Sequence, residues 1–189
     1  MAQAKTLNKR ELKRVLDYND ACERHSERNR AMLLFTHLCG MRIGEVVALR
    51  VSDVIDDNGE VKGELRLGAE QTKGSRARVV FVPTRMRKEI KRYVEHLTVR
   101  SCSDFLFRTQ KSRCFSSNSA TQLLQRIYER SGHKGATSHS GRRSFITELA
   151  SKGVGVRVLA ELSGHRSIAT TQRYIDVNDD MLRKAVELV

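Results

Sequence analysis

A histidine and a tyrosine stand nine residues apart near the end of the chain, in the segment LSGHRSIATTQRYI at residues 162–175. His165 follows a glycine and Tyr174 follows an arginine. Each has a simple structural explanation, since His165 can cap a helix and Tyr174 can pack in a core. An unactivated phenol has a pKa near about 10 and is a weak nucleophile. Chemistry at this pair therefore requires partners from elsewhere in the chain.

Three earlier segments carry side chains that bind anions or move protons. Arg42, in GMRIGEV, follows a glycine, and its simplest role is an ion pair with Glu45 three residues later. Lys73, in QTKGSRARVV, falls at an expected β-turn, where a lysine is usually only solvated. His139 and Arg142, in SHSGRRSF, lie three residues apart on one face of a helix start. Capping and surface charge explain this pair about as well as a functional role does.

Taken together, the two arginines, the lysine, the two histidines and the tyrosine suit phosphodiester chemistry. Two arginines can bind the non-bridging oxygens of one phosphodiester and stabilise a pentacoordinate transition state, as a divalent metal does in most nucleases. A tyrosine hydroxyl can attack the phosphorus and hold the cut strand as a phosphotyrosine ester. A lysine can protonate the leaving oxygen, and histidines can move protons or hydrogen-bond the phosphate.

The composition favours a nucleic-acid partner. The chain has 35 Lys and Arg against 22 Asp and Glu, a formal net charge of +13 over 189 residues, and such a surplus favours a polyanion. The four cysteines and the histidines have no metal-ligand spacing, so we expect reduced thiols, no metal and no cofactor. The N-terminus is charged, and no apolar run approaches the roughly 20 residues that span a bilayer, so we expect a cytoplasmic protein without membrane contact.

The elements that must position these residues are mainly helical in the first part of the chain. Asn8 and Glu11 have the spacing of a capping box and start a helix of about three turns. The apolar segment RNRAMLLFTHLCG predicts a second helix that ends at Gly40. The segment MRIGEVVALR restarts as a short helix with its apolar side chains buried.

From Val51 the hydrophobic period changes to two, which predicts two or three antiparallel strands over 53–70 and 75–83, with turns at 57–59 and 73–74. Thr84 is expected to cap the basic helix TRMRKEIKRYVEHLTV. Five more helices are expected in ATQLLQRIYERSG, HSGRRSFITELASKG, VRVLAELSG, IATTQRYI and DDMLRKAVELV. This order of elements predicts a single α+β domain, mainly helical.

The order of the candidate residues resembles the tyrosine recombinase (phage integrase) family. The most specific parts are HxxR at 139–142 and GHxxxxTTxxY at 164–174, and GMRIGEVVAL is similar to the family's first arginine box. The resemblance extends over nearly the whole chain, from about Thr6 to Val189. It implies the tyrosine recombinase catalytic-domain fold, mainly helical with a small antiparallel sheet on one edge.

The resemblance also implies a role for each candidate residue. The implied catalytic residues are Arg42, Lys73, His139, Arg142, His165 and Tyr174. Glu45 is implied to support these side chains without contacting the substrate itself. The arginines bind the scissile phosphate, and the lysine is the general acid for the 5′-hydroxyl. His139 assists proton transfer, and His165 hydrogen-bonds the phosphate. The tyrosine is the nucleophile that forms a 3′-phosphotyrosyl link.

Two departures from the family pattern stand out. Many members have His-x-Leu-Arg-His in the second box, whereas this chain has Gly141 and Arg143 at the Leu and second His positions. The glycine is expected to loosen the packing beneath the box. Most members also have an N-terminal core-binding domain, which is expected to be absent here, so that residues 1–189 form a single catalytic domain. A natural short chain, as in the fimbrial-switch recombinases, and a fragment both fit this expectation.

The implied function is that of a site-specific DNA recombinase, or integrase, that acts without metal. Its expected partners are double-stranded DNA, further copies of itself in a tetramer on DNA, and accessory DNA-bending proteins, in a cytoplasmic, nucleoid-associated setting. Two alternatives use the same residues or fold: a type IB topoisomerase-like relaxing enzyme and a DNA-binding regulator without turnover. The sequence is compatible with integration, excision, inversion or dimer resolution. It is also compatible with a terminal helix that packs on its own protomer (cis) or on a neighbouring protomer (trans).

Overall fold

The computed structural model describes residues 4–72, 75–97, 101–110, 112–175, 182–183 and 186–187. Lys73 and most of the helix expected over 179–189 lie outside these residues. The helices are α1 (Lys9–Cys22), α2 (Ser26–Leu38), α3 (Ile43–Val47), α4 (Val51–Val54), α5 (Thr84–Glu95), α6 (Ser117–Arg130), α7 (Ser140–Ser151), α8 (Val156–Ser163) and α9 (Ile168–Gln172). The strands are β1 (Glu64–Leu67) and β2 (Arg78–Phe81), with a 3-10 turn at Ala69–Gln71 between them.

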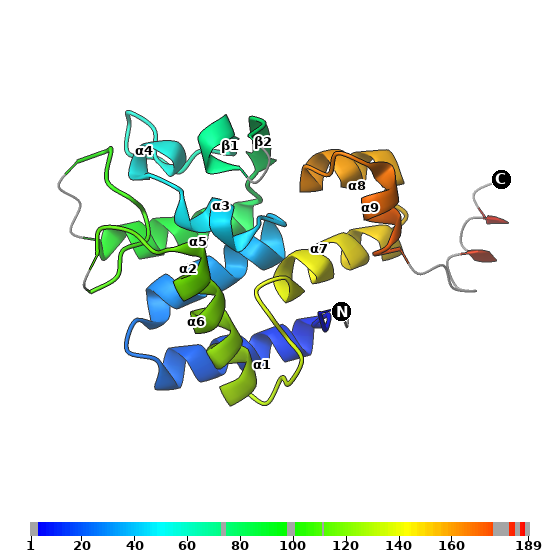
Figure 1. Cartoon of the computed structure of the whole chain (residues 1–189), viewed down its shortest axis with the longest axis horizontal. Helices are drawn as coiled ribbons and strands as arrows, with labels where there is room; N and C mark the ends of the chain where they lie inside the picture. Colours follow the sequence, from blue (N-terminus) through cyan, green and yellow to red (C-terminus); the bar gives the residue numbers. More distant parts are fainter. Residues whose placement is uncertain are drawn as a thin grey trace.

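Helix α2 is the centre of the molecule. It packs against α1, α3, α5 and α7, and every side chain from Ala31 to Phe35 is buried. A helix that is apolar on all sides is stable only when other elements surround it. Figure 1 shows the sheet and α4 along one edge, α8 and α9 beside them, and α1 at the opposite edge. The expected class, α+β and mainly helical with a small sheet at the edge, is confirmed.

Local signals predicted the ends of the first two helices. The Asn8 side chain accepts from the Glu11 backbone N–H, and the Glu11 carboxylate accepts from the Asn8 N–H, each at 2.9 Å. Helix α2 ends at Leu38, and Gly40 follows with a φ of +62°. A Cβ on Gly40 would lie 2.5 Å from the Phe145 ring, so this turn also lets α7 approach α2 closely.

The start of the strand region expected over 53–70 is wrong, because residues 51–54 form the short helix α4. The Asp53 carboxylate accepts from the Arg50 backbone N–H at 2.8 Å, which closes a helical turn. Val51 and Val54 are buried with a helical spacing of three. The turn at 57–59 is present, but the pairing around it is reduced to one bridge, Ile55 with Val61.

The sheet has two antiparallel strands, with Leu65 opposite Val80 and Leu67 opposite Arg78. Leu65, Leu67 and Val80 are buried, so one face of the sheet belongs to the core. Arg78 lies in the same alternating phase as Val80 and is therefore directed toward the buried face.

Two helix starts differ from expectation by a few residues. Pro83, rather than Thr84, is the N-cap of α5, and Thr84 is its first helical residue. Helix α6 begins at Ser117, earlier than expected, because the Ser116 side chain accepts from the Ser119 N–H at 3.0 Å and caps it. Within the described part of the chain, no helix combines the length and apolarity needed to cross a membrane.

Candidate active site

The structure brings four of the six expected catalytic residues together, along with Glu45. Arg42 precedes α3, Arg142 lies on α7, and His165 and Tyr174 flank α9. Arg42 and Arg142 donate hydrogen bonds to the carbonyls of Gly164 and Ser163, next to His165. The ring of Tyr174 stacks on that of His165, with centroids 5.8 Å apart and planes at 15°. Residues more than 120 positions apart thus meet at the end of α8.

Arg42 and Glu45 form the ion pair that the i,i+3 spacing predicted. One Glu45 oxygen accepts from the Arg42 guanidinium and the other from the Arg42 backbone N–H, each at 2.9 Å. The Glu45 side chain is 1% exposed, whereas 24% of Arg42 is exposed. Burial acts to raise the pKa of Glu45, but Arg78 and Arg42 outweigh it and lower the pKa. The pair therefore fixes Arg42 and still leaves part of its guanidinium accessible.

Arg142 is a buried cation held by neutral groups. Arg142 is 4% exposed. Its guanidinium donates to the carbonyl of Gly40 at 2.6 Å and to that of Ser163. Burial and the charge of Arg42 lower the pKa of Arg142 to about 9. An anion bound between the two arginines would relieve this repulsion. The arrangement favours an anion such as a phosphodiester.

Gly141 is required by the approach of α7 to α2. A Cβ at this position would lie 2.0 Å from Oγ1 of Thr36 and 2.9 Å from Cδ2 of His37. The expectation that this glycine loosens the packing beneath the HxxR box is therefore wrong. The two helices are closer here than a side chain would allow.

His139 stands immediately before α7 and is exposed. Together with Arg42 and Glu45 it lines a cavity of about 500 Å³. A second cavity of about 500 Å³, between β2 and α8, is lined by Arg42, Glu45 and His165. Thr72 lines both cavities and directly precedes Lys73 in the sequence.

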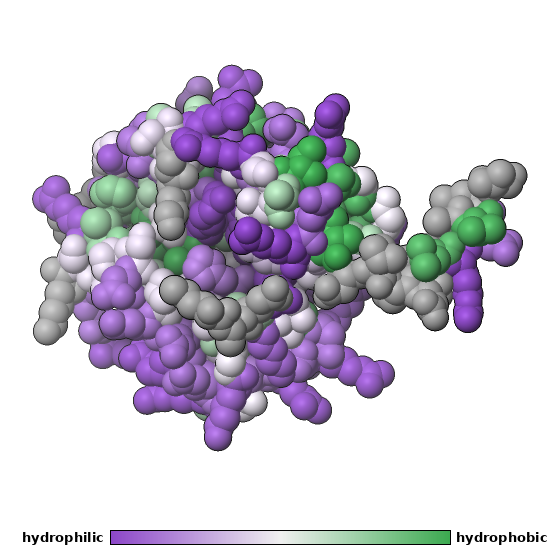
Figure 2. Space-filling view, turned by 45° about the vertical axis from the view of Figure 1, so that its right-hand side comes forward, coloured by the Kyte–Doolittle hydropathy of each residue, from purple (hydrophilic) through white to green (hydrophobic). Residues whose placement is uncertain are grey.

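The second cavity has an apolar outer rim. Val79, Phe81 and Val158 line it and are 39%, 55% and 54% exposed. Figure 2 shows a mainly hydrophilic face, on which hydrophobic side chains gather beside α8. This cavity thus combines charged lining residues with partly exposed apolar side chains.

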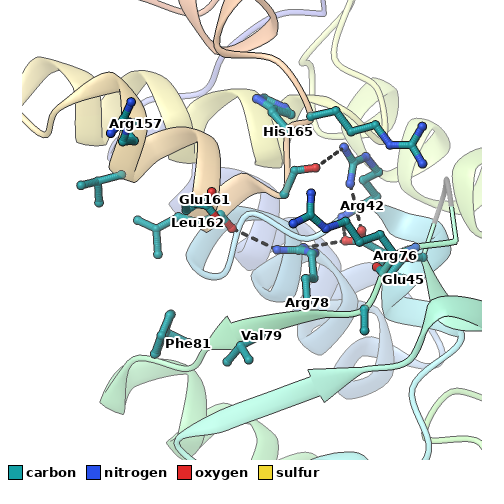
Figure 3. A pocket seen from close by; sticks show the side chains of 15 residues that line it. Arg42, Glu45, Arg76, Arg78, Val79, Phe81, Arg157, Glu161, Leu162 and His165 are labelled. Carbon is teal, nitrogen blue, oxygen red and sulfur yellow. Dashed lines mark hydrogen bonds and ion pairs between the residues drawn. The ribbon is translucent and has the colours of Figure 1, made fainter.

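The end of α8 is built around Gly164, which has a φ of +60°. The His165 N–H donates to the Ala160 carbonyl at 2.9 Å and the Gly164 N–H to the Glu161 carbonyl at 3.0 Å, a Schellman motif. The next three carbonyls, those of Leu162, Ser163 and Gly164, accept from Arg78, Arg142 and Arg42 respectively. Figure 3 shows Arg78 and Arg42 reaching this turn from different elements. Arg78 was not among the residues expected from the sequence, although an arginine in the buried phase of a strand is a signal that could have identified it.

His165 is held as a neutral ring. Burial, and then the charges of Arg142, Arg42 and Arg78, lower its pKa to about 4. Its Nδ1 lies 2.8 Å from Oγ1 of the buried Thr171. When this hydroxyl donates to Nδ1, Nε2 carries the proton and can donate to a phosphate oxygen.

The simple roles considered for His165 and Tyr174 do not match the structure. Ser167, not His165, is the N-cap of α9. Tyr174 is only partly buried and lies outside the core. Its carbonyl accepts from the Thr147 hydroxyl of α7 at 3.3 Å, which ties the tyrosine to the helix that carries Arg142. Among the described residues, no group of three His, Cys, Asp or Glu side chains could hold a metal ion.

The model of the phage integrase family matches residues 5–181. The chain belongs to the phage integrase family. Tyrosine recombinase XerA of Thermococcus kodakarensis is 33% identical over 186 residues, which are 97% of this chain and 62% of that relative. A crystal structure of XerA recombinase superimposes with a TM-score of 0.78 at 24% identity, over all of this chain and 66% of that one. A structure of XerH site-specific recombinase bound to difH substrate gives a TM-score of 0.71 at 24% identity, over 96% of this chain and 53% of that one.

This phage integrase family chain spans between about half and two thirds of the length of these relatives. The fold expected from the resemblance, that of a tyrosine recombinase catalytic domain, is confirmed by these superpositions.

Proposed function

We propose that residues 1–189 form one catalytic domain of a site-specific DNA recombinase, which cleaves and rejoins DNA through a 3′-phosphotyrosyl intermediate. The observation that carries this proposal is the position of two arginines and a neutral histidine around one turn, with the tyrosine stacked on the histidine. Membership of the phage integrase family and the names of the relatives support it.

In the proposed reaction, Arg42 and Arg142 bind the non-bridging oxygens of the scissile phosphate, and Nε2 of His165 donates to one of them. The hydroxyl oxygen of Tyr174 forms a bond to phosphorus while the bond from phosphorus to the 5′-oxygen breaks. His139 assists removal of the phenol proton, and Lys73 gives a proton to the leaving 5′-oxygen. The assignment of Lys73 rests on the resemblance of its segment to the family. Attack by a 5′-hydroxyl on the phosphotyrosine reverses these steps and rejoins the strand.

The proposed substrate is double-stranded DNA, bound through the basic surface. Exchange between two duplexes cuts four strands, and with one tyrosine for each cut it needs four copies of the chain. A homotetramer on DNA, with accessory DNA-bending proteins and a location at the nucleoid, completes the proposal.

The experiment compares the wild type with Tyr174→Phe on a library of nicked duplexes of randomised sequence. The wild type is expected to form a detergent-stable, protease-sensitive protein–DNA adduct on a subset of sequences. Tyr174→Phe is expected to bind DNA as the wild type does and to form no adduct, because only the nucleophilic oxygen is lost. Tyr18→Phe, at a tyrosine of α1 packed against the core, is the matched control and should form the adduct normally.

Other outcomes distinguish the alternatives. An adduct formed by Tyr174→Phe would refute the assignment of the nucleophile. DNA binding without any adduct in the wild type would favour a regulator, and relaxation of supercoils without sequence preference would favour a topoisomerase-like enzyme.

A further inference from the structure

Arg78 is a buried arginine that joins the sheet to the candidate active site. Its side chain is 10% exposed. One terminal nitrogen donates to Glu45 at 2.7 Å, and the other donates to the Leu162 carbonyl at 3.0 Å. A planar guanidinium can hold two acceptors in a fixed relative position, which a single ammonium cannot do. Arg78 thereby fixes the start of α3 relative to the end of α8.

The first acceptor, Glu45, also holds Arg42. The same carboxylate oxygen that accepts from Arg78 accepts from the Arg42 backbone N–H, while the other oxygen accepts from the Arg42 guanidinium. A buried carboxylate that loses one cationic partner is left incompletely paired, which favours a change of rotamer or uptake of a proton. The orientation of Arg42 therefore depends on Arg78 through Glu45.

The second acceptor lies on the turn that carries His165. The carbonyls of Leu162, Ser163 and Gly164 are consecutive, and each accepts from a different arginine. The stem of Arg78 also packs directly against Gly164, since a Cβ there would lie 2.7 Å from Cδ of Arg78. Arg78 therefore supports the backbone from which both phosphate-binding arginines and His165 take their positions.

We propose that Arg78 is a positioning residue, which holds Glu45 and the end of α8 so that Arg42, Arg142 and His165 converge on one phosphate. This inference rests on the proposed function, because it assigns a role within that active site. Arg78 shares the Glu45 carboxylate with Arg42, and both of its terminal nitrogens donate hydrogen bonds from the β2 side of the turn (Figure 3). Arg78 acts through Arg42 and the turn and does not itself bind the scissile phosphate.

The test uses Arg78→Ala and Arg78→Lys in the full chain, with Arg66→Ala as a control for the lost charge. Arg66 lies on β1 with its side chain exposed, opposite Val79. The rate of adduct formation on nicked duplex DNA is measured at saturating DNA, and the dissociation constant is measured separately. Misplacement of catalytic groups by about 1 Å can reduce a rate about 10²-fold. We expect a loss of that order for Arg78→Ala and about a tenfold loss for Arg78→Lys. The dissociation constants should stay close to that of Arg66→Ala.

A pH profile separates positioning from a general structural role. The charged groups facing Glu45 are Arg42 before α3, Arg78 on β2 and Arg142 on α7. The charge of Arg78 lowers the pKa of both Glu45 and His165, so its loss should move the acidic limb of the cleavage profile to higher pH in Arg78→Ala. The limb should move less in Arg78→Lys, because an ammonium group still faces the carboxylate. Acid unfolding also begins at a higher pH in a less stable variant, so circular dichroism at each pH must show that the variant stays folded where the limb moves.

The outcomes are distinct. Adduct formation by both Arg78 variants at the Arg66→Ala rate, while Tyr174→Phe forms none, would overturn this inference and leave the proposed function intact. An unshifted pH profile in a folded Arg78→Ala would also overturn it. Absence of an adduct in the wild type would refute the proposed function and this inference with it. If Arg78→Ala does not fold, as judged by circular dichroism, the rate and profile of Arg78→Lys decide the matter.

Discussion

At the scale of single residues, different side chains of the candidate site carry the positive charge and donate a hydrogen bond from an uncharged group. The arginines are charged at neutral pH, whereas His165 is surrounded by cations that disfavour its protonation. A neutral imidazole with a fixed tautomer is a hydrogen-bond donor that does not change with mild acidification. Thr171, the second threonine of the TTxxY segment, supplies the oxygen that orients this ring.

The pKa of His165, about 4, leads to a prediction about its titration. Between about pH 8 and pH 5 the ring should remain neutral in the folded protein, although a free histidine titrates near about 6.5. Because the folded pKa is depressed, the unfolded chain binds this proton first, and the contribution of His165 to stability falls as the pH drops from about 6.5 towards 4. Nitrogen-15 NMR of labelled histidine checks this, and a titration of His165 near pH 6.5 would contradict it.

At the scale of elements, the site depends on how closely α7 approaches α2. The hydroxyl of Thr36 donates to the Leu33 carbonyl at 2.7 Å within α2, and Gly141 lies directly over it. Arg142, the next residue along α7, reaches the Gly40 carbonyl just beyond the end of α2. The position of the second arginine therefore follows from the contact between these two helices.

Gly141→Ala should destabilise the protein and reduce cleavage, because the added methyl group overlaps Thr36. Overpacking of this kind costs about 1–3 kcal/mol of unfolding free energy. Gly63→Ala is the matched control, since a Cβ there meets nothing within 4 Å. It should change stability by less than about 0.5 kcal/mol. Denaturant unfolding of both variants measures the difference, and equal stability of the two would refute the close contact.

Local and long-range interactions differ in how far the sequence predicts them. Asn8 and Glu11 predicted the start of α1 because the hydrogen bonds that form the cap lie within three residues. At Val51 an alternating pattern and a helical spacing of three were both present, and the Asp53 cap decided in favour of a helix. The catalytic candidates were predicted from motifs. For Arg78 the strand alternation indicates a buried side chain, but its partners lie 33 and 84 residues away and no local pattern identifies them.

At the scale of the whole molecule, the charge of +13 predicts how the chain responds to salt. Binding of lysines and arginines to DNA phosphates releases condensed counterions. The logarithm of the binding constant should therefore fall with the logarithm of salt concentration, with a slope of about −0.9 for each phosphate contact on duplex DNA. Gel-shift titrations of Tyr174→Phe at several salt concentrations measure this slope without interference from cleavage. A flat response would mean that the basic surface does not contact DNA.

The three carbonyls at the end of α8 have a consequence for how the site meets an anion. The C-terminus of a helix carries a partial charge of about −0.5. The end of α8 therefore offsets part of the positive charge of Arg42, Arg78 and Arg142. The arginines are thus held close together and oriented before DNA binds, so their side chains reorganise little when a phosphate binds. A change that unwound the last turn of α8 would remove this partial charge, leaving Arg42 and Arg78 with Glu45 and Arg142 without its Ser163 acceptor.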